Sequence, residues 1–344
     1  MNEIFILLLA ILFYSLIAWG VRTLAGERWQ IMASIPLEKT PDGRWRGLNL
    51  TYYGLFSANA YAISAMIMYL LCRSAGTPSP AFFTFAAILL TLCMASARFL
   101  AHMVEKKRYT FTIGGASFTG LVTAPVLVPI LNGIMHDAIP LLPAMAALSV
   151  SYACGEGLGR LACISFGCCY GKPVEEAHPL LRKTFSGMSF TFTGKTKKIA
   201  YERGLEGRPV IPVQAMTATV CIAAGLAGIY LFLEGFFIWS FLLSLTVTQG
   251  WRCLSERMRA DHRGKAGVST YQVMGLASIP IGWTIALFAP NPSIHPVLAD
   301  GISSLRDPVF LSFVLLFWTF SFLYTGISKV TGSLISFHVH RDRI

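Results

Sequence analysis

The chain has 344 residues, of which 54% are hydrophobic and only 13% are charged. The charged fraction is about half that of an ordinary soluble domain, and the mean hydropathy is +0.59. These values exclude a disordered chain, a collagen-like fibre and an ordinary soluble enzyme, and they indicate a membrane protein. The formal net charge of +11 then points to topology signals or anionic-lipid contacts, and we expect no nucleic-acid partner.

Nine uncharged apolar stretches of about 17 to 26 residues are each long enough to cross a bilayer. In chain order they run approximately over 4–20, 51–72, 80–97, 110–135, 138–155, 209–233, 235–251, 266–290 and 308–328. The first is preceded by no basic side chain, so we interpret it as an uncleaved helix and not as a signal peptide. Pro140 and Pro143 indicate that the fifth is broken or tilted, and Glu234 and Gly235 alone separate the sixth from the seventh.

The fold class we predict is an all-α polytopic membrane protein with about nine transmembrane helices and one longer extramembrane loop subdomain. Residues 1–50 form an N-terminal helix and a polar loop, and residues 51–290 form the membrane core. The loop subdomain lies at about 172–208 and is expected to contain loops or short strands. Residues 291–344 form a further helix and a tail.

The basic residues gather on one side of the predicted membrane protein. The loop over 160–208, for example, carries nine basic and four acidic residues, and the loops that lie on the other side have little net charge. The positive-inside rule places this basic side and the C-terminus in the cytoplasm.

Several polar side chains lie at span ends on this same basic side. They are Tyr52, Tyr53, Arg98, Glu156, Arg160, Arg252, Glu256 and Arg259. A single arginine at a helix end often only extends to the lipid headgroups, but the convergence of several favours a polar cavity. Arg252, Glu256 and Arg259 are spaced i, i+4 and i+7, which predicts one helical face. Because guanidinium groups bind phosphate through two parallel hydrogen bonds, the cluster suggests a clamp for a phospholipid headgroup.

The densest motif runs from Gly155 to Pro173 and contains Cys163, Cys168 and Cys169. Its glycines allow close approach of backbone to backbone or to a ligand, and no strand precedes it as a dinucleotide site would require. For the adjacent Cys168 and Cys169, three interpretations stay open, in this order: packing, a reactive or lipid-adjacent thiol, and a metal ligand. A zinc site usually needs a second cysteine or histidine pair, so we expect no metal ion and no cofactor.

The order of these motifs resembles the prolipoprotein diacylglyceryl transferase family, over roughly residues 51–280. Tyr52-Tyr53-Gly54-Leu55 is similar to the family's Trp-Tyr-Gly-Leu, and the segment 114–120 is similar to Gly-Gly-Met-Ser-Phe-His-Gly. The signature Gly-Arg-x-Gly-Asn-Phe-x-Asn-x-Glu-x-x-Gly aligns without a gap on Gly159 through Gly171. Four further landmarks also match: Arg98 for a Gly-Gly-Arg segment, Gln214 for a Pro-x-Gln, the Arg252, Glu256 and Arg259 triplet, and Gln272 followed by Ser278-Ile279-Pro280.

The chain also departs from the family's pattern. Thr119 stands where the family has histidine, a candidate base for the acceptor thiol. Cys163 and Cys168 stand at a signature asparagine and glutamate, and Met216 and Thr217 replace a tyrosine and a glutamate. The arginine pair that resembles the family's lipid-binding residues, Arg160 and Arg252, is present. The resemblance therefore implies an intact phospholipid half of the site and a changed acceptor half.

The resemblance implies transfer of diacylglyceryl from phosphatidylglycerol to a thiol acceptor such as a prolipoprotein cysteine. We expect Arg160, Arg252, Cys163, Cys168, Cys169 and Tyr53 to carry the reaction. Substrate contacts are expected from Arg98, Glu256, Arg259, Gln214, Gly159, Gly171 and Thr119. The alternatives are a transferase of the same fold with another acceptor, and a non-catalytic lipid-binding or transport protein.

The expected location is the bacterial inner membrane. The family works on its outer face, whereas the charge distribution places the matching end of the helices inside. We favour the outer face, because an anionic-lipid site gives a separate reason for the basic residues.

Overall fold

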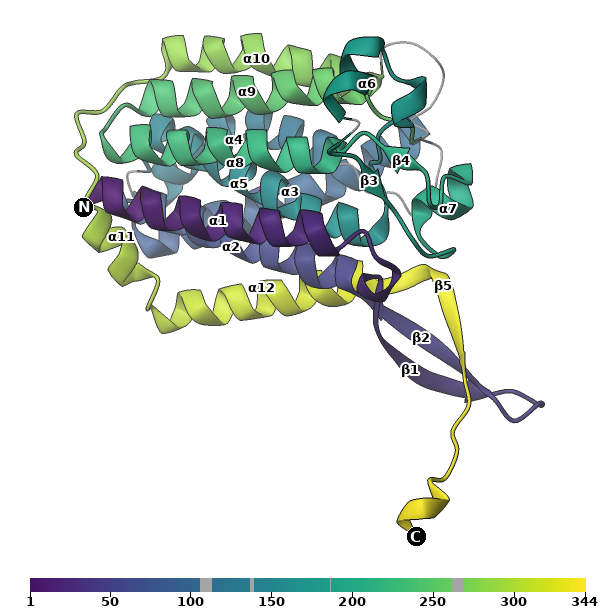
Figure 1. The fold of residues 1–344 in the computed structure, drawn as a ribbon. Helices are drawn as coiled ribbons and strands as arrows, with labels where there is room; N and C mark the ends of the chain where they lie inside the picture. Colours follow the sequence, from purple (N-terminus) through teal and green to yellow (C-terminus); the bar gives the residue numbers. More distant parts are fainter. Residues whose placement is uncertain (106–112, 137–138, 186, 262–268) are drawn as a thin grey trace.

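The computed structural model describes residues 1–105, 113–136, 139–185, 187–261 and 269–344. In this part of the chain, nine long helices lie side by side and form a bundle (Figure 1). They are α1 (Asn2–Thr23), α2 (Tyr52–Ser74), α3 (Ser79–Glu105), α4 (Ile113–Met135), α5 (Leu141–Phe166), α8 (Val213–Leu233), α9 (Phe237–Arg257), α10 (Thr270–Phe288) and α12 (Pro308–Gly326). Within the described ranges, all of them except α9 are long and apolar enough to cross a membrane, which makes eight candidate spans. The prediction of a polytopic helical membrane protein is confirmed.

Helix α9 matches the seventh predicted span in position but not in apolar character. Its 21 residues include Ser240, Ser244, Thr248 and Gln249, all of them buried. These side chains face α5, α8 and α10, against which α9 packs. Polar groups at membrane depth normally face the interior of a bundle, and the polar face of α9 does so.

Helix α5 is the centre of the bundle, and α2, α8 and α9 pack around it. Small residues allow the close approach: a methyl group on Gly157 would lie 2.8 Å from Ile222 of α8, and one on Gly155 would lie 3.0 Å from Ser64 of α2. The predicted break in this span is wrong, because the helix is continuous from Leu141 to Phe166. Pro140 precedes the helix and Pro143 lies in its first turn, where a missing N–H leaves no hydrogen bond unmade.

The short connections at the end of the bundle where α1 begins agree with the sequence (Figure 1). Gly235, at φ 82°, makes the tight turn between α8 and α9. The short helix α11 (Leu298–Ser304) leads into α12 and packs against α2, where Gly301 lies against the backbone of Leu70.

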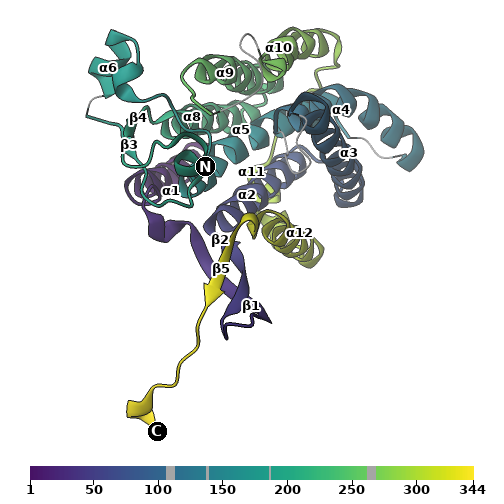
Figure 2. The same cartoon turned by 90° about the vertical axis from the view of Figure 1, so that its right-hand side faces the viewer.

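A three-stranded antiparallel sheet projects from the other end, where a polar loop and a tail were predicted (Figures 1 and 2). Its order is β1 (Ile31–Lys39), β2 (Trp45–Thr51) and β5 (Ile327–Ile335), and the 3-10 helix η1 (Glu27–Trp29) precedes it. The segments predicted as a polar loop and a tail thus contain three strands, which the sequence did not predict. Strand pairing between β2 and β5 joins segments far apart in sequence, and no local pattern reports such a contact.

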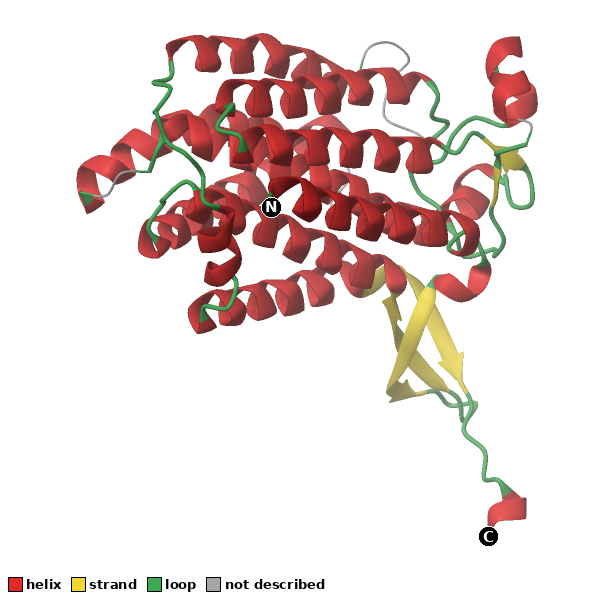
Figure 3. Cartoon of the chain, turned by 60° about the vertical axis from the view of Figure 1, so that its left-hand side comes forward, coloured by secondary structure: helices red, strands yellow, loops and turns green. Residues whose placement is uncertain are grey.

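The segment between α5 and α8 forms a small subdomain at this same end. It contains η2 (Val174–Glu176), α6 (Pro179–Phe185), β3 (Phe190–Thr191), α7 (Lys198–Arg203) and β4 (Pro209–Val210). An apolar cluster includes Phe190, Phe192, Ile199 and Val210 and joins the subdomain to Leu161 and Ile164 of α5. The chain ends near η3 (Arg341–Arg343), beyond the sheet (Figure 3). The loops predicted over 21–50 and 160–208 and the tail thus lie on one end of the bundle.

Candidate functional site

A small polar cavity lies where α5, α8 and α9 meet at the basic end of the bundle. Its lining residues are Glu156, Arg160, Thr217, Cys221, Thr248, Trp251, Arg252, Ser255 and Arg259. Its volume is about 10 Å³, enough for one water molecule. Three of the predicted arginines therefore converge on one place, although Arg160 lies almost a hundred residues before Arg252 and Arg259 in the chain.

Arg160 comes from α5 and is held by Glu156, one turn earlier on the same helix. The two side chains form an ion pair and are only 12% and 6% exposed. The guanidinium Nε of Arg160 is buried and has no hydrogen-bond partner among the described residues. Because an unmet buried donor is costly, this atom is available to an acceptor that enters the cavity.

Arg252 comes from α9 and has a different set of neighbours. Its Nη1 donates a hydrogen bond to the hydroxyl oxygen of Tyr152, at 3.1 Å, and within the described part of the chain its buried Nε is also without a partner. The guanidinium lies against Gly114 of α4, where a methyl group would come within 2.9 Å of Nη2. This contact gives a reason for glycine at the first position of the segment over 114–120.

Arg259 and Glu256 complete the predicted triplet, but the three do not share one helical face. Helix α9 ends at Arg257, and Arg259 lies beyond it, with two hydrogen bonds of 2.7 Å to the carboxylate of Asp261. Glu256 accepts a 2.5 Å hydrogen bond from the hydroxyl of Ser269, the N-cap of α10. Arg252 and Arg259 line the cavity, whereas Glu256 links α9 to α10.

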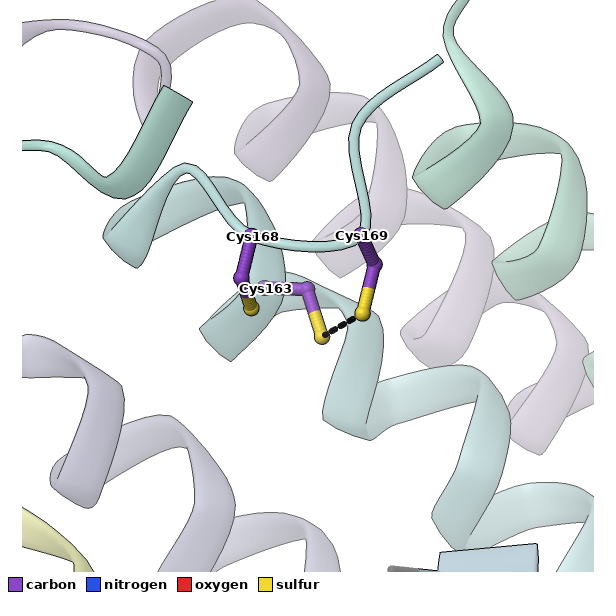
Figure 4. Close-up of side chains that lie close together, drawn as sticks. All are labelled: Cys163, Cys168 and Cys169. Atoms are coloured by element: carbon purple, nitrogen blue, oxygen red, sulfur yellow. Dashed lines mark hydrogen bonds between the residues drawn. The ribbon is translucent and has the colours of Figure 1, made fainter. Parts of the chain in front are cut away.

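Three thiols gather directly beside this cavity. Cys163 lies in the last turn of α5, which ends at Gly167 in the left-handed conformation, and Cys168 and Cys169 follow. The three Sγ atoms lie within 4.8 Å of one another, and those of Cys163 and Cys169 are 3.8 Å apart (Figure 4). Arg160 connects the two groups, because its Nη1 is 4.0 Å from the Sγ of Cys163.

Two landmarks of the sequence hold the loop that carries these thiols. Gln214, fully buried at the start of α8, donates a 2.8 Å hydrogen bond from Nε2 to the carbonyl oxygen of Cys168. Gly171 forms an isolated antiparallel β-bridge with Arg259. It also lies so close to Ile211 that a methyl group on Gly171 would lie 2.3 Å from the carbonyl oxygen of Ile211. The thiol loop and the segment after α9 are therefore fixed to each other.

The surroundings change the acidity of the thiol at Cys169. Hydrogen bonds from Cys163 and Cys168, with the positive charges of Arg259 and Arg160, hold its pKa well below the usual value of a thiol. Burial acts in the opposite direction and is outweighed. The structure thus favours a thiolate at this position.

The remaining predicted residues lie at different distances from the cavity. The ring of Tyr53 of α2 contacts that of Phe166 in a tilted arrangement, with centroids 5.4 Å apart, and Tyr53 is within electrostatic range of the three thiols. Arg98 instead lies over Tyr324 of α12, to which its Nε donates a 3.2 Å hydrogen bond. Gly159 faces Ala60 of α2, and Thr119 is half-buried on α4; neither these two nor Arg98 is among the described residues that line the cavity.

Two contacts in the region of the site were not predicted from the sequence. Tyr152 precedes Arg160 by eight residues, so it lies on the same side of α5 about two turns earlier, and that spacing was the available signal. Lys197 is fully buried and donates to the carbonyl oxygens of Leu24 and Ser165, at 3.2 and 2.6 Å. It joins the subdomain to the C-terminal ends of α1 and α5, and its place in a basic run gave no indication of burial.

Comparison with known proteins identifies one family. The model of the prolipoprotein diacylglyceryl transferase family matches residues 44–288, well over half of the chain and nearly all of the helix bundle that surrounds the cavity. A search of curated proteins finds no match. On the extent of the family match, the chain belongs to the prolipoprotein diacylglyceryl transferase family.

Proposed function

We propose that this protein transfers diacylglyceryl from phosphatidylglycerol to a thiol acceptor such as a prolipoprotein cysteine. The observation that supports it best is the pair Arg160 and Arg252, which come from different helices and line one cavity. Each keeps a buried Nε that has no partner among the residues described. Two guanidinium groups with unmet donors suit an anionic headgroup phosphate.

The two arginines are held in different ways, which gives them different roles. Glu156 neutralises part of the charge of Arg160 and fixes its position on α5, so Arg160 approaches the phosphate with a defined direction. Tyr152 occupies only one nitrogen of Arg252, so more of its donors are open to the lipid. Because the cavity has room for about one water, we expect the arginine side chains to move apart when the headgroup binds.

The acceptor half of the site is formed by Cys163, Cys168, Cys169 and Tyr53. Cys163 lies next to Arg160, and the other three residues lie around Cys163, so a thiol that enters there meets the lipid on the side of its phosphate. Positive charge near the leaving phosphate stabilises the charge that develops as the carbon–oxygen bond breaks. Thr119 has no group that accepts a proton at neutral pH, so activation of the acceptor must come from elsewhere.

Reconstitution and complementation test this proposal together. The purified protein in vesicles with labelled phosphatidylglycerol and a lipobox peptide should produce the diacylglyceryl peptide and release glycerol phosphate. In a strain depleted of its own diacylglyceryl transferase, the gene should restore lipoprotein modification. Consumption of the lipid without rescue would instead support a different acceptor, and no consumption would support a non-catalytic lipid-binding protein.

We further propose that the protein lies in the bacterial inner membrane with the cavity at its outer face, as the family suggests. A cysteine introduced at Asp42, in the turn between β1 and β2, reports the side of the cavity, and one at Asn291 reports the opposite end of the bundle. In intact cells, a membrane-impermeant maleimide should label Asp42→Cys above the parent protein and leave Asn291→Cys at the parent level. The reverse pattern would place the cavity in the cytoplasm.

A further inference from the structure

The three thiols beside the arginine cavity form a ligand set for a metal ion. We propose that Cys163, Cys168 and Cys169 bind Zn²⁺ and that the acceptor thiol occupies the fourth position of the metal. The role we give to the metal ion rests on the proposed transfer reaction, but metal binding itself can be tested without that reaction. The ion would take the place of a basic side chain in activating the acceptor.

The distances among the sulfur atoms suit tetrahedral zinc. With zinc–sulfur bonds of about 2.3 Å, two thiolates on one tetrahedral ion lie about 3.8 Å apart. The Sγ atoms of Cys163 and Cys169 are 3.8 Å apart, and all three pairs are within 4.8 Å. Small rotations of Cys168 would complete the set. A disulfide needs sulfur atoms about 2.05 Å apart, which this arrangement does not provide.

The backbone positions the two adjacent cysteines so that both can bind one metal ion. Gly167 ends α5 in the left-handed conformation, and Cys169 adopts it too, at φ 56°. A side chain with a Cβ is strained there and stays only where its surroundings hold it. Gln214 fixes the intervening Cys168 carbonyl. The result is that Cys168 and Cys169 both point toward Cys163, one turn back on α5 (Figure 4).

The number of ligands points to a reactive site and not to a structural one. In the part of the chain that the structure describes, the cluster contains three cysteines and no fourth histidine, cysteine or carboxylate within the same range. Structural zinc is usually closed by four protein ligands, whereas catalytic zinc keeps one position for water or substrate. Three thiolates from the protein leave that position open.

The charges around the cluster favour a thiolate-rich ion. Three thiolates on Zn²⁺ carry one net negative charge, and an acceptor thiolate adds another. Arg160 lies 4.0 Å from Cys163, and Arg259 is within electrostatic range of Cys169. Glu156 and Asp261 orient these two guanidinium groups, whose positive ends remain close to the sulfur atoms.

Transfer of diacylglyceryl to a zinc-bound thiolate would need no reactant other than the lipid and the acceptor thiol. When the acceptor thiol binds zinc, its proton passes to solvent and its sulfur stays on the ion as a thiolate. A sulfur lone pair then attacks the carbon of the diacylglyceryl group that bears the phosphate, and a carbon–sulfur bond forms. The carbon–oxygen bond breaks, its electron pair goes to the phosphate oxygen, and glycerol phosphate leaves beside Arg160 and Arg252.

The sequence favoured no metal because a zinc site usually has a second cysteine or histidine pair, and none is apparent. The third member of the set is Cys163, five residues before Cys168. The left-handed turn at Gly167 folds the chain back, and that turn brings the third thiol into range.

Zinc content of the purified protein tests the site. After reduction and exposure to zinc, the full chain in detergent should retain about one zinc per chain by elemental analysis. Cys163→Ser, Cys168→Ser and Cys169→Ser should each lower the retained zinc about tenfold or more. The matched control is Cys93→Ser, a half-buried cysteine on α3, which should retain the wild-type amount. A wild-type chain that retains no zinc, or variants that all retain it, would overturn the proposal.

Two further measurements address folding and role. Cobalt-loaded wild-type protein, which needs no substitution, should show the absorption of a tetrahedral thiolate complex, and ethanethiol should alter it by taking the fourth position. An unchanged spectrum would contradict an open site. Removal of the metal with a chelator should abolish transfer to the lipobox peptide, and zinc should restore it. Transfer that is independent of zinc would refute the catalytic role but keep the proposed function. Zinc binding without any consumption of phosphatidylglycerol would refute the proposed function but keep the metal site.

Discussion

Replacement of Arg252 by alanine is the sharpest test of the phospholipid half of the site. Arg252 has no carboxylate partner among its hydrogen bonds in the described structure, so its removal leaves only the hydroxyl oxygen of Tyr152 without its donor. We expect this to cost about 1 kcal/mol of stability. Arg160→Ala would be harder to interpret, because it leaves the carboxylate of Glu156 buried and unpaired, which costs about 3–5 kcal/mol.

The expected loss of activity follows from the donors that Arg252 offers. Its Nε and one further N–H can form two charge-assisted hydrogen bonds to a phosphate, each contributing about 1.5–3 kcal/mol. The loss of both corresponds to roughly a hundred- to twenty-thousandfold fall in kcat/KM. Arg252→Lys keeps the charge but loses the paired geometry, so we expect a fall of about ten- to a hundredfold.

The assay is transfer from labelled phosphatidylglycerol in vesicles, with kcat and KM measured for each variant that remains monodisperse in detergent. Arg257→Ala is the control, because this exposed arginine lies on the same helix, within two turns of Arg252. It should retain wild-type activity. If Arg252→Ala transfers lipid as well as Arg257→Ala does, the proposed phosphate contact is wrong.

Two further predictions use other contacts of the same region. Gly114→Ala places a methyl group within about 3 Å of the Arg252 guanidinium and should lower kcat/KM about tenfold without unfolding the protein. The control is Gly133→Ala, on the same helix with open space around it, which should have no effect. Equal activity of the two variants would contradict the contact between Gly114 and Arg252. Burial lowers the pKa of Lys197 from 10.5 to about 8, so the folded state binds fewer protons than the unfolded state between these values, and the stability should rise as the pH increases through this window. In thermal unfolding from pH 7.5 to 10, Lys197→Met should lack this part of the rise, and parallel curves for the two proteins would argue against a lowered pKa of Lys197 in the folded state.

The sequence predicts the parts of this molecule that depend on local patterns. Continuous apolar runs locate the membrane helices to within a few residues at most ends, and the tight turn at Gly235 follows from the two-residue gap. The convergence of Arg160 and Arg252 was also predictable in part, because both lie at span ends on the same side of the membrane. These signals work because membrane burial and side are properties of a segment, not of its partners.

What the sequence does not predict depends on contacts between distant segments. The pairing of β2 with β5 and the burial of Lys197 each need a partner far away in the chain. Helix α9 looked like another span, but its polar face is explained only by the neighbours that cover it. The thiol cluster depends on a left-handed turn after α5, which adjacent cysteines in a sequence do not reveal.

The one-sided positive charge can now be divided into two groups with separate causes. Arg160, Arg252 and Arg259 line the cavity, and the proposed lipid site accounts for them. Many other basic residues at that end are exposed on the sheet and the subdomain, such as Arg46 and Arg208. Exposed charges of this kind act on membrane insertion and on the surface potential, whereas buried ones act on the ligand. A lipid site therefore does not remove the topology signal, and an outer location of the cavity would mean that insertion of this chain overrides the exposed positive charge.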